Sequence, residues 1–348
     1  MSNILILQNW NDHLELFKFE QKDIYFTEEY VKLYENGNNK AECFIFAEEN
    51  NVFLFPYLKT QIPGSQGNQY DIESAYGYGG PLVNSSDDQF CSRAWHKFYD
   101  YCSQNMIVCG FVRFHPLLKN HVSFQDDEFK LNSIHVRKTV ALNLELPSET
   151  IWNMEIHSKH RNTIRLAEKN GLRFVSDDTL ENIDEFIIMY NKMIKAICVD
   201  DLYFFESSYY QSIKDNLRNK CFLGLIYLNN TIVSAAIFFY YGIYGHYHLA
   251  GSLEEYQRYG SNNLLLYRSA LYLKSKGIKM FHLGGGTSND ESDSLYKFKK
   301  RFSKTLYDFY IGTMVFNKRI YDEICGAWEK KYPEKIDRYG SMFLKYRY

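Results

Sequence analysis

The chain has 348 residues, enough for two domains of ordinary size, and its 45% hydrophobic and 17% aromatic content describes a globular protein with large cores. Its formal net charge of −2 provides no general attraction for DNA or an acidic membrane, so any anion site must be local. The seven cysteines are scattered without a C-x-x-C pair, which fits a reducing compartment and argues against disulfides or structural zinc.

Two segments decide whether the sequence predicts export or membrane insertion: the N-terminus and the longest apolar run. Met1 to Trp10 has no basic segment before its apolar residues, so we expect no signal peptide. Ile232 to Tyr241 is too short to span a bilayer. These features predict a soluble, cytoplasmic protein.

The first part of the chain predicts a strand, a helix near Thr27–Tyr34 and then a mixed α/β segment. Two apolar strands flank Asn50-Asn51, a hairpin signal because Asn tolerates the positive φ of tight turns. A helix then starts near Ser86 and ends near Gln104, and a strand follows from Ile107 to Phe114.

The same order of elements returns later in the chain. An apolar strand at Cys221–Leu223 leads through Asn229-Asn230 into Ile232–Phe239. A helix at about Ser261–Lys276 then leads into a strand at Ile278–Leu283. This order indicates two copies of one mixed α/β unit, with chance similarity between ordinary hairpins as the alternative.

Between the two copies, Pro147 to Gly171 predicts a long helix that carries a row of positive charge. Arg161, Arg165 and Lys169 are four residues apart along one flank, and Lys159 is nearby. Like charges at this spacing repel each other, so the row makes most sense facing an anion. A solvated basic face partly neutralised by Glu168 is the alternative.

The segment from Ile278 to Phe302 combines a short strand, the glycine turn Gly284–Gly286 and a helix that begins near Asp293. On this helix Lys299 falls within the core-facing stripe of Leu295, Phe298 and Phe302. A lysine among core-facing aromatics costs free energy unless its ammonium meets an anion or developing negative charge. The alternative is a lysine whose stem packs while its head reaches water.

Three stretches together resemble motifs of the Fem family, the aminoacyl-transferring enzymes of peptidoglycan cross-bridge synthesis. Ser158–Gly171 resembles the K-x-R-x-x-I-x-x-A-x-x-x-G helix of that family. Leu283–Gly286 and Leu295–Phe302 resemble its glycine loop and its F-K-x-x-F segment, and Tyr76–Pro81 sits where the family has an R-G-P turn. The similarity covers roughly residues 40 to 330.

The resemblance implies an α/β fold of two tandem GNAT-like domains, each a mixed, mostly antiparallel sheet with flanking helices, with a cleft between them. The first domain would comprise residues 1–145 and the returning segment 316–348, and the second, catalytic domain residues 146–315. The tRNA-binding helical arm of some family members has no counterpart, because Asp177–Lys220 is too short and aromatic-rich for it.

The resemblance also implies acyl transfer to an amine, in which Lys299 stabilises the tetrahedral intermediate or the leaving group. Lys159, Arg161 and Arg165 would hold substrate phosphate. Further candidates for substrate binding, each with a structural role as the alternative, are Tyr76, Tyr78, Gly79, Gly80, Arg113, His115 and His248. His246 and His248 share one face of a strand and are too isolated to predict a metal site.

Gln257, Gly260 and Ser261 precede a helix and resemble the pyrophosphate loop of acetyl-CoA-dependent GNAT enzymes, where a helix N-terminus binds the anion. Asn262 occupies the place of a small residue there, and a simple helix cap is the alternative. No general base can be assigned. Asn84 stands where the family often has an aspartate, which leaves Asp71, Glu73, water or the substrate itself.

We therefore expect an N-acyltransferase that acts on a cell-wall or surface-polysaccharide precursor. Its co-substrate would be aminoacyl-tRNA or acyl-CoA, with no permanently bound cofactor and no metal. Its partners would be a phosphate-bearing sugar or cell-wall precursor, and tRNA if that is the donor, with no DNA and at most peripheral membrane contact through a lipid-linked substrate. An acyl-CoA-dependent N-acetyltransferase of an amino sugar and a non-catalytic anion-binding module are the alternatives.

Overall fold

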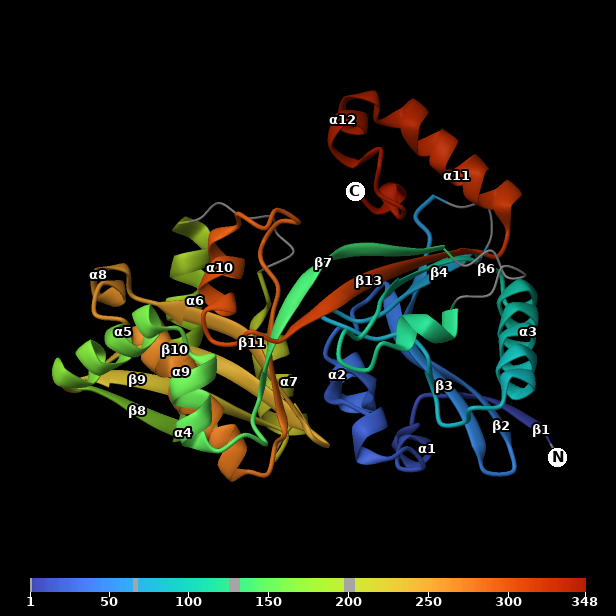
Figure 1. Cartoon of the computed structure of the whole chain (residues 1–348). Coiled ribbons are helices and arrows are strands. Elements are labelled where there is room, and N and C mark those ends of the chain that lie inside the picture. The colour runs from blue at the N-terminus through green and yellow to red at the C-terminus, as the bar shows by residue number, and fades with distance from the viewer. Residues whose placement is uncertain (1, 65–67, 125–131, 197–203) are drawn as a thin grey trace. The chain divides into compact units, whose positions relative to one another are not determined.

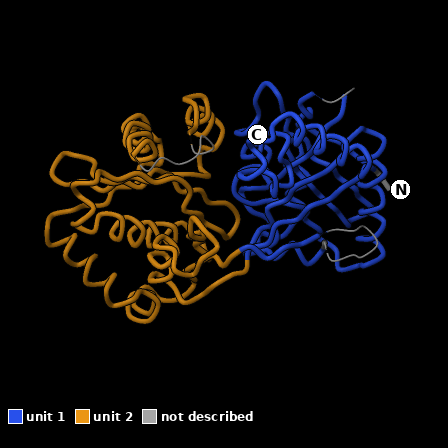
Figure 2. The backbone as a smooth tube through the Cα atoms, turned by 90° about the horizontal axis from the view of Figure 1, so that it is seen from above, with its two compact units in different colours: residues 1–136, 309–348 blue, residues 137–308 orange. Residues whose placement is uncertain are grey.

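The computed structural model describes residues 2–64, 68–124, 132–196 and 204–348 (Figure 1). The chain forms two compact units, which are residues 1–136 with 309–348 (unit 1) and residues 137–308 (unit 2) (Figure 2). It passes from one unit to the other inside strands β7 (Asn132–Asn143) and β13 (Leu306–Val315). Residues 137–145 thus group with unit 2 and residues 309–315 with unit 1.

The sheet of unit 1 has the strand order β1-β2-β3-β4-β6-β13, and β5 pairs with β3. Among the described strands of this unit, neighbours are antiparallel except β4 and β6, which are parallel. The strands, besides β13, are β1 (Ser2–Leu7), β2 (Asn39–Glu48), β3 (Asn51–Gln61), β4 (Tyr70–Glu73), β5 (Leu82–Val83) and β6 (Ile107–Arg113).

The main core of unit 1 lies under helix α3 (Asp88–Gln104), which Asp87 caps as the sequence predicts. Phe98 packs edge-on against Phe44, and Trp95 against Phe53, with ring centroids 5.1 Å apart in both pairs. A second core lies between β6 and helix α11. The other helices of this unit are α1 (Asn11–Leu14), α2 (Glu28–Lys32), α11 (Lys318–Lys331) and α12 (Ile336–Tyr339).

The sheet of unit 2 has the strand order β8-β9-β10-β11-β12-β7. Its neighbouring strands are antiparallel except β11 and β12, which are parallel. The strands, besides β7, are β8 (Leu172–Asp177), β9 (Cys221–Leu228), β10 (Thr231–Tyr241), β11 (Tyr244–Ser252) and β12 (Met280–Gly284).

Helix α9 (Ser261–Ser275) supplies the centre of the core of unit 2, where Leu264, Leu265 and Leu266 are fully or almost fully buried with Phe222 and Phe238. The other helices are α4 (Ser148–Thr150), α5 (Ser158–Lys169), α6 (Ile183–Ala196), α7 (Ser207–Asn216), α8 (Glu254–Gln257) and α10 (Ser294–Lys300). The stretch from 177 to 220, where no helical arm is expected, contains α6 and α7, and its residues 197–203 lie outside the described part of the chain.

The two sheets confirm the internal repeat, because they have the same order of strands and the same single parallel pair. Strands β2, β3, β4 and β6 correspond to β9, β10, β11 and β12, with α3 and α9 before the last of them. The sixth strand of each sheet does not follow this order in the sequence. In unit 1 it is β13, which pairs with β6 and comes after all the strands of unit 2. In unit 2 it is β7, which pairs with β12 and comes before all the other strands of that unit.

The structure differs from two local predictions, which concern the turn of the first hairpin and the helix before Gly171. The first predicted hairpin forms between β2 and β3, but its positive φ falls on Glu49, at 55°, and not on Asn50 or Asn51; in the second hairpin it falls on Asn229 as expected. The long helix predicted from Pro147 to Gly171 is interrupted. A π-helical turn at Ile151–Glu155 is followed by an extended residue, and a new helix, α5, starts at Ser158.

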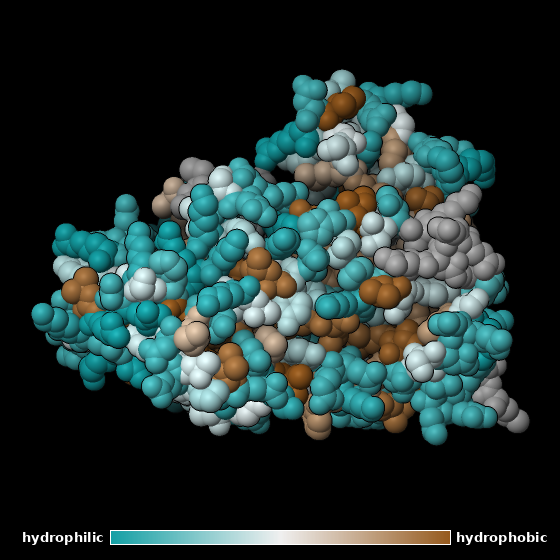
Figure 3. All heavy atoms as spheres, viewed as in Figure 1, coloured by the Kyte–Doolittle hydropathy of each residue, from teal (hydrophilic) through white to brown (hydrophobic). Residues whose placement is uncertain are grey.

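Two observations describe how apolar residues are distributed on the surface and in the helices. On the face drawn in Figure 3, hydrophilic residues predominate and apolar residues form small separate groups. Within the described part of the chain, none of the helices combines the length and the apolar character that crossing a bilayer requires.

The C-terminal residues are fixed to unit 1 by a buried ionic network on β4. Arg347 donates hydrogen bonds to the carboxylates of Asp71 and Glu73, and Tyr346 donates from its hydroxyl to Asp71 at 2.7 Å. Arg113 also donates to Glu73, at 3.3 Å. Burial opposes ionisation of Glu73, but the two guanidinium groups outweigh it and lower its pKa.

Replacement of Arg347 by methionine is expected to lower the free energy of unfolding by roughly 3 kcal/mol at pH 7, because it leaves the buried carboxylate of Asp71 without a cationic partner and removes one of the two guanidinium groups that bind Glu73. The native pKa of Glu73 is lowered, so the stabilisation it brings is complete above its usual value of about 4.3 and is lost as the pH falls below it. Urea unfolding at pH 7 and at pH 4 measures both effects. The exposed Arg319→Met is the control, and an equal loss for both variants would contradict the prediction.

Candidate functional site

Lys299 is the buried charged residue of helix α10 in unit 2. Asp293 caps this helix by accepting a hydrogen bond from the backbone N–H of Tyr296 at 2.8 Å. The side chain of Lys299 is turned inward, so that the residue is only 8% exposed. Its ammonium donates to the carbonyl oxygen of Gly285 at 2.8 Å and lies 5.7 Å from the centre of the Tyr247 ring. The residue that the sequence places among core-facing aromatics is therefore buried.

The environment of Lys299 lowers the pKa of its ammonium to about 8. Burial is the main cause, because it disfavours the charged form, and the charge of Arg137 acts in the same direction. Asp293 opposes both. At pH 7 the side chain is still mostly a cation, and it is held by neutral acceptors.

The glycine loop between β12 and α10 is fixed between a cation and an anion. Arg137 donates to the carbonyl oxygen of Gly286 at 2.7 Å. Asp293 accepts from the backbone N–H of Thr287 at 3.1 Å, and its hydrogen bonds lower its pKa to about 2. A Cβ on Gly286 would lie 2.4 Å from a carboxylate oxygen of Asp293, so only glycine fits there without a shift. The loop thereby presents the Gly285 carbonyl to Lys299.

The parallel strands β11 and β12 pair over three residues only, from Tyr244 opposite Met280 to His246 opposite His282. Strand β11 continues to Ser252 without further pairing to β12. The residue next to the last pair is Tyr247, whose ring lies below the Lys299 ammonium. Where parallel strands separate, their backbone amides can pair with a ligand instead, so this is a place where an extended acyl donor can bind beside a cation.

The basic residues of helix α5 differ in burial and in the groups that they contact. Arg161 is half-buried, and its Nη1 donates to the carbonyl oxygens of Trp152, Asn153 and Ile156 at 3.2, 3.0 and 2.6 Å. It thus satisfies carbonyls at the end of the π-helical turn. Arg165 is exposed and lies over the Trp152 ring at 5.3 Å, and Lys159 is exposed.

Helix α5 meets α10 through His160 rather than through the arginines. Burial lowers the pKa of His160 to about 4, so the ring is neutral at pH 7, and its Nε2 donates to the carbonyl oxygen of Phe298 at 2.9 Å. The ring also packs against Phe298 and Phe302, with centroids 5.1 and 4.6 Å away. His160 therefore links the two helices whose motifs the sequence singles out.

In unit 1, the loop with Tyr76, Tyr78, Gly79 and Gly80 is shaped by its own protein neighbours. A Cβ on Gly79 would lie 2.8 Å from Ser74, and Gly80 has a φ of +95°. The side-chain amide of Asn120 donates to the carbonyl oxygens of Gly79 and Pro81 at 2.8 and 3.0 Å. The tyrosines are half-buried, and Tyr78 packs edge-on against Tyr25.

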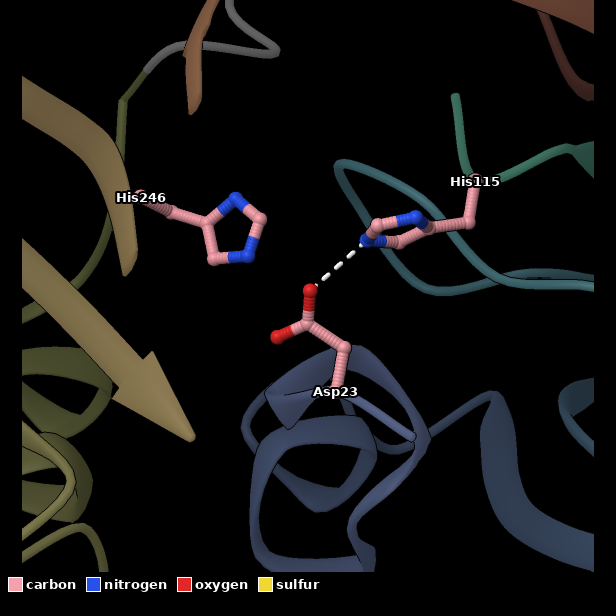
Figure 4. A group of neighbouring side chains, drawn as sticks. All are labelled: Asp23, His115 and His246. Carbon is pink, nitrogen blue, oxygen red and sulfur yellow. Dashed lines mark hydrogen bonds and ion pairs between the residues drawn. The ribbon is translucent and has the colours of Figure 1, made fainter. Parts of the chain in front are cut away.

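His115 forms a fully buried pair with Asp23 (Figure 4). Its Nδ1 accepts from the backbone N–H of Leu118 at 3.1 Å, so the ring proton is on Nε2, which donates to Asp23 at 2.8 Å. Both ring nitrogens are thus engaged within unit 1. Figure 4 also draws His246, which lies on β11 of unit 2. Arg113 is held by Glu73 and by the carbonyl oxygen of Ser74, both at 3.3 Å.

His248 lies on β11 and shares a hydrogen bond of 2.6 Å with the hydroxyl of Tyr209. Burial lowers its pKa to about 3, and the ring is therefore neutral at physiological pH. A neutral, hydrogen-bonded ring can transfer a proton but cannot provide fixed positive charge.

The loop expected to bind a pyrophosphate, with Gln257, Gly260 and Ser261, is packed against helix α5. Gly260 has a φ of +76°, and a Cβ there would lie 2.4 Å from a methyl group of Thr163. Ser261 is fully buried, while Gln257 is exposed and donates to Ser252 at 3.2 Å. The N-terminus of α9 is therefore covered by α5.

Sequence reasoning missed Tyr247 and Arg137 as neighbours of Lys299. Tyr247 sits between the two histidines of β11 and, by the period of two, points to the other face, which is a signal that the sequence offers. Arg137 lies far from Lys299 in the chain and has no local signal. Asn84 stands where the Fem family often has an aspartate. Its side-chain oxygen accepts a hydrogen bond from the backbone N–H of Val52 at 2.7 Å, so this residue stabilises the hairpin.

Alanine at Arg161 is expected to lower the free energy of unfolding by about 2–3 kcal/mol, because three carbonyls lose a charged donor. Alanine at Arg165 removes only a stacked contact and is expected to cost less than about 1 kcal/mol. Urea unfolding of the two variants tests this contrast. Equal effects would show that the carbonyl contacts of Arg161 contribute little.

Comparison with known proteins agrees with this geometry. Residues 157–300 match a family model described as an acetyltransferase (GNAT) domain, while no curated protein sequence matches the chain. Among solved structures, the chain is similar to FemX, with a TM-score of 0.74 and 13% sequence identity over 92% of this chain and 99% of that one.

Two further structures have a similar fold. One is the C-terminal domain of a putative lysylphosphatidylglycerol synthetase from Agrobacterium fabrum, with a TM-score of 0.57 and 14% identity over 90% of this chain and 93% of that one. The other is a tandem GNAT protein from the clavulanic acid biosynthesis pathway, with a TM-score of 0.56 and 7% identity over 91% and 99%. The match identifies a GNAT acetyltransferase domain at residues 157–300, and the similarity to these solved structures shows that the chain as a whole has the tandem fold of FemX and of the tandem GNAT protein.

Proposed function

We propose that the chain transfers an aminoacyl or acyl group to an amine of a cell-wall or surface-polysaccharide precursor, with Lys299 stabilising the charge that develops during transfer. The observation that carries this proposal is the buried ammonium of Lys299, which is 8% exposed. Among the described residues its contacts are a carbonyl oxygen and an aromatic ring, and no carboxylate forms an ion pair with it. A buried cation without a counter-ion is costly in the free protein and becomes favourable when negative charge appears beside it.

The chemistry follows from that placement. The neutral amine of the acceptor attacks the carbonyl carbon of an ester or thioester, and the carbonyl oxygen becomes an oxyanion. The Lys299 ammonium stabilises this oxyanion or the leaving oxygen or sulfur as the old bond breaks. The attacking nitrogen then loses a proton, which passes directly or through water to the leaving oxygen or sulfur. Asp71 is buried against Arg347 and Glu73 is bound to two arginines, so neither serves as the base.

Positive charge for a phosphate of the substrate is assigned to Lys159 and Arg165. Both are exposed on helix α5, and this helix is joined to α10 by the hydrogen bond from His160 to Phe298. Arg161 is assigned a different task, because its contacts with three carbonyls keep the start of α5 in place. A phosphate-bearing sugar, a lipid-linked precursor or tRNA each offers the anion that this pair requires.

The packing around α9 favours an aminoacyl ester as the donor. GNAT domains take acyl-CoA as co-substrate, and its pyrophosphate would need the N-terminus of α9. The close approach of Gly260 to Thr163 and the burial of Ser261 oppose this. We place the reaction in the cytoplasm, since scattered cysteines fit a reducing compartment. A binding module without catalysis is the second candidate function. It is favoured by Asn84, because an amide that bonds the hairpin occupies the position where the Fem family often has an aspartate that could act as the base.

Replacement of Lys299 by methionine is expected to lower kcat by at least about 100-fold with little change in KM, because a donor to the developing charge is lost. The control is Lys297→Met, on the exposed side of the same helix, which is expected to keep its turnover. Purified protein is mixed with aminoacyl-tRNA or acyl-CoA pools and amino-sugar nucleotides, and products are measured by mass spectrometry.

Turnover with one donor class identifies the donor. Retained turnover in Lys299→Met, with native circular dichroism, would contradict the assigned role. Absence of turnover with every donor for the unmodified protein would favour the binding module.

The alkaline limb of the pH profile provides an independent test. The pKa of Lys299 is lowered to about 8, so the charged form, which the mechanism requires, is lost as the pH rises through 8. We expect kcat/KM to fall about tenfold per pH unit above that point. An active Lys299→Arg variant keeps its charge and is expected to lose this limb. A limb that stays in place in Lys299→Arg would belong to another group.

A further inference from the structure

Unit 1 contains a hollow of about 610 Å³ that the acyl-transfer proposal does not use. This volume lies within the range of small-molecule sites, about 300–1,000 Å³. Its polar lining comprises Asn36, Asn38, Asn39, Thr60, Gln61, Glu73 and Arg347. These residues come from three strands, one loop and the end of the chain.

The register of the sheet explains why three of these side chains, Asn39, Thr60 and Glu73, lie together. Asn39 of β2 is opposite Thr60 of β3, and Thr60 is opposite Asp71 of β4. Residues that are opposite in neighbouring strands share a face, and Glu73, two residues after Asp71, shares it as well. The C-terminal Arg347 lies on this face and is bound to both carboxylates.

The charges of the hollow cancel. Glu73 and the buried Asp71 are balanced by Arg347 and Arg113, so a charged ligand gains no net attraction from them. Hydrogen-bonding capacity nevertheless remains. Three of the five N–H groups of Arg347 donate to carboxylates, which leaves one on each terminal nitrogen.

We propose that this hollow binds an uncharged, hydroxyl-rich ligand, namely a sugar residue. Each sugar hydroxyl both donates and accepts, and the exposed amides of Asn38 and Gln61 offer both functions in return. Glu73 accepts further hydroxyls, and the free N–H groups of Arg347 donate to them. A peptide would instead need an open strand edge for its backbone, and β3 is paired on both sides.

Binding of sugars to the full-length protein tests this site. The probes are glucose, galactose, N-acetylglucosamine and its β-1,4-linked trimer, and a blocked tri-alanine peptide serves as the comparison. Ligand-observed NMR and calorimetry are expected to show that at least one sugar binds with a Kd on the order of 1 mM. The variant Asn38→Ala/Gln61→Ala is expected to weaken this binding at least tenfold. Gln104→Ala, an exposed glutamine at the end of α3, is expected to leave it unchanged.

Three results would overturn the site: no binding by any of the sugars, equal binding by the double variant, or binding of the peptide alone. Circular dichroism verifies that the double variant is folded, which its two exposed positions favour. All residues tested belong to unit 1, so sugar binding and acyl transfer succeed or fail separately.

Discussion

One buried ammonium group, that of Lys299, is the feature on which the proposed chemistry of unit 2 depends. Lys299 is held by the Gly285 carbonyl and the Tyr247 ring, and neither of them neutralises its charge. Helix α10 carries the lysine inward, Asp293 caps that helix, and the glycine loop turns its carbonyl toward the ammonium. Each of these features costs little alone, whereas the unneutralised cation is costly. Ionisable groups with strongly shifted pKa values cluster at functional sites, which is why the proposed function is built on this one.

The repeated architecture places the parts around this cation. Both units have the same strand order and one parallel pair, and in unit 2 that pair, β11 with β12, ends after three residues. Directly after the last pair comes Tyr247, whose ring lies 5.7 Å from the Lys299 ammonium. Unit 1 has diverged in its corresponding region, where β4 carries Asp71 and Glu73 and binds the C-terminal Arg347. The same fold thus holds a buried cation in one copy and a charge-balanced hollow in the other.

Much of this arrangement is predictable from local sequence, and the remainder depends on tertiary contacts. The helix predicted from near Ser86 to near Gln104 is found as α3, and the stripe on α10 predicts the burial of Lys299. The break before α5 is not visible in the sequence, because it depends on Ile156 adopting an extended conformation and on Arg161 satisfying the freed carbonyls. The row of basic residues on α5 shows which side of the helix they occupy, but it does not show which groups they contact. Contacts between residues far apart in the chain, such as Arg137 with Gly286, leave no local pattern.

The titration of Lys299 itself is the most direct test of this account. Protein labelled with 13C at lysine Cε, with the Lys299→Arg variant used to assign the signal, can be followed by NMR from about pH 6 to pH 11. The account predicts a pKa of about 8 for this lysine. A value near the usual 10.4 would mean that the ammonium is hydrated, and the buried cation on which the proposed chemistry depends would not exist.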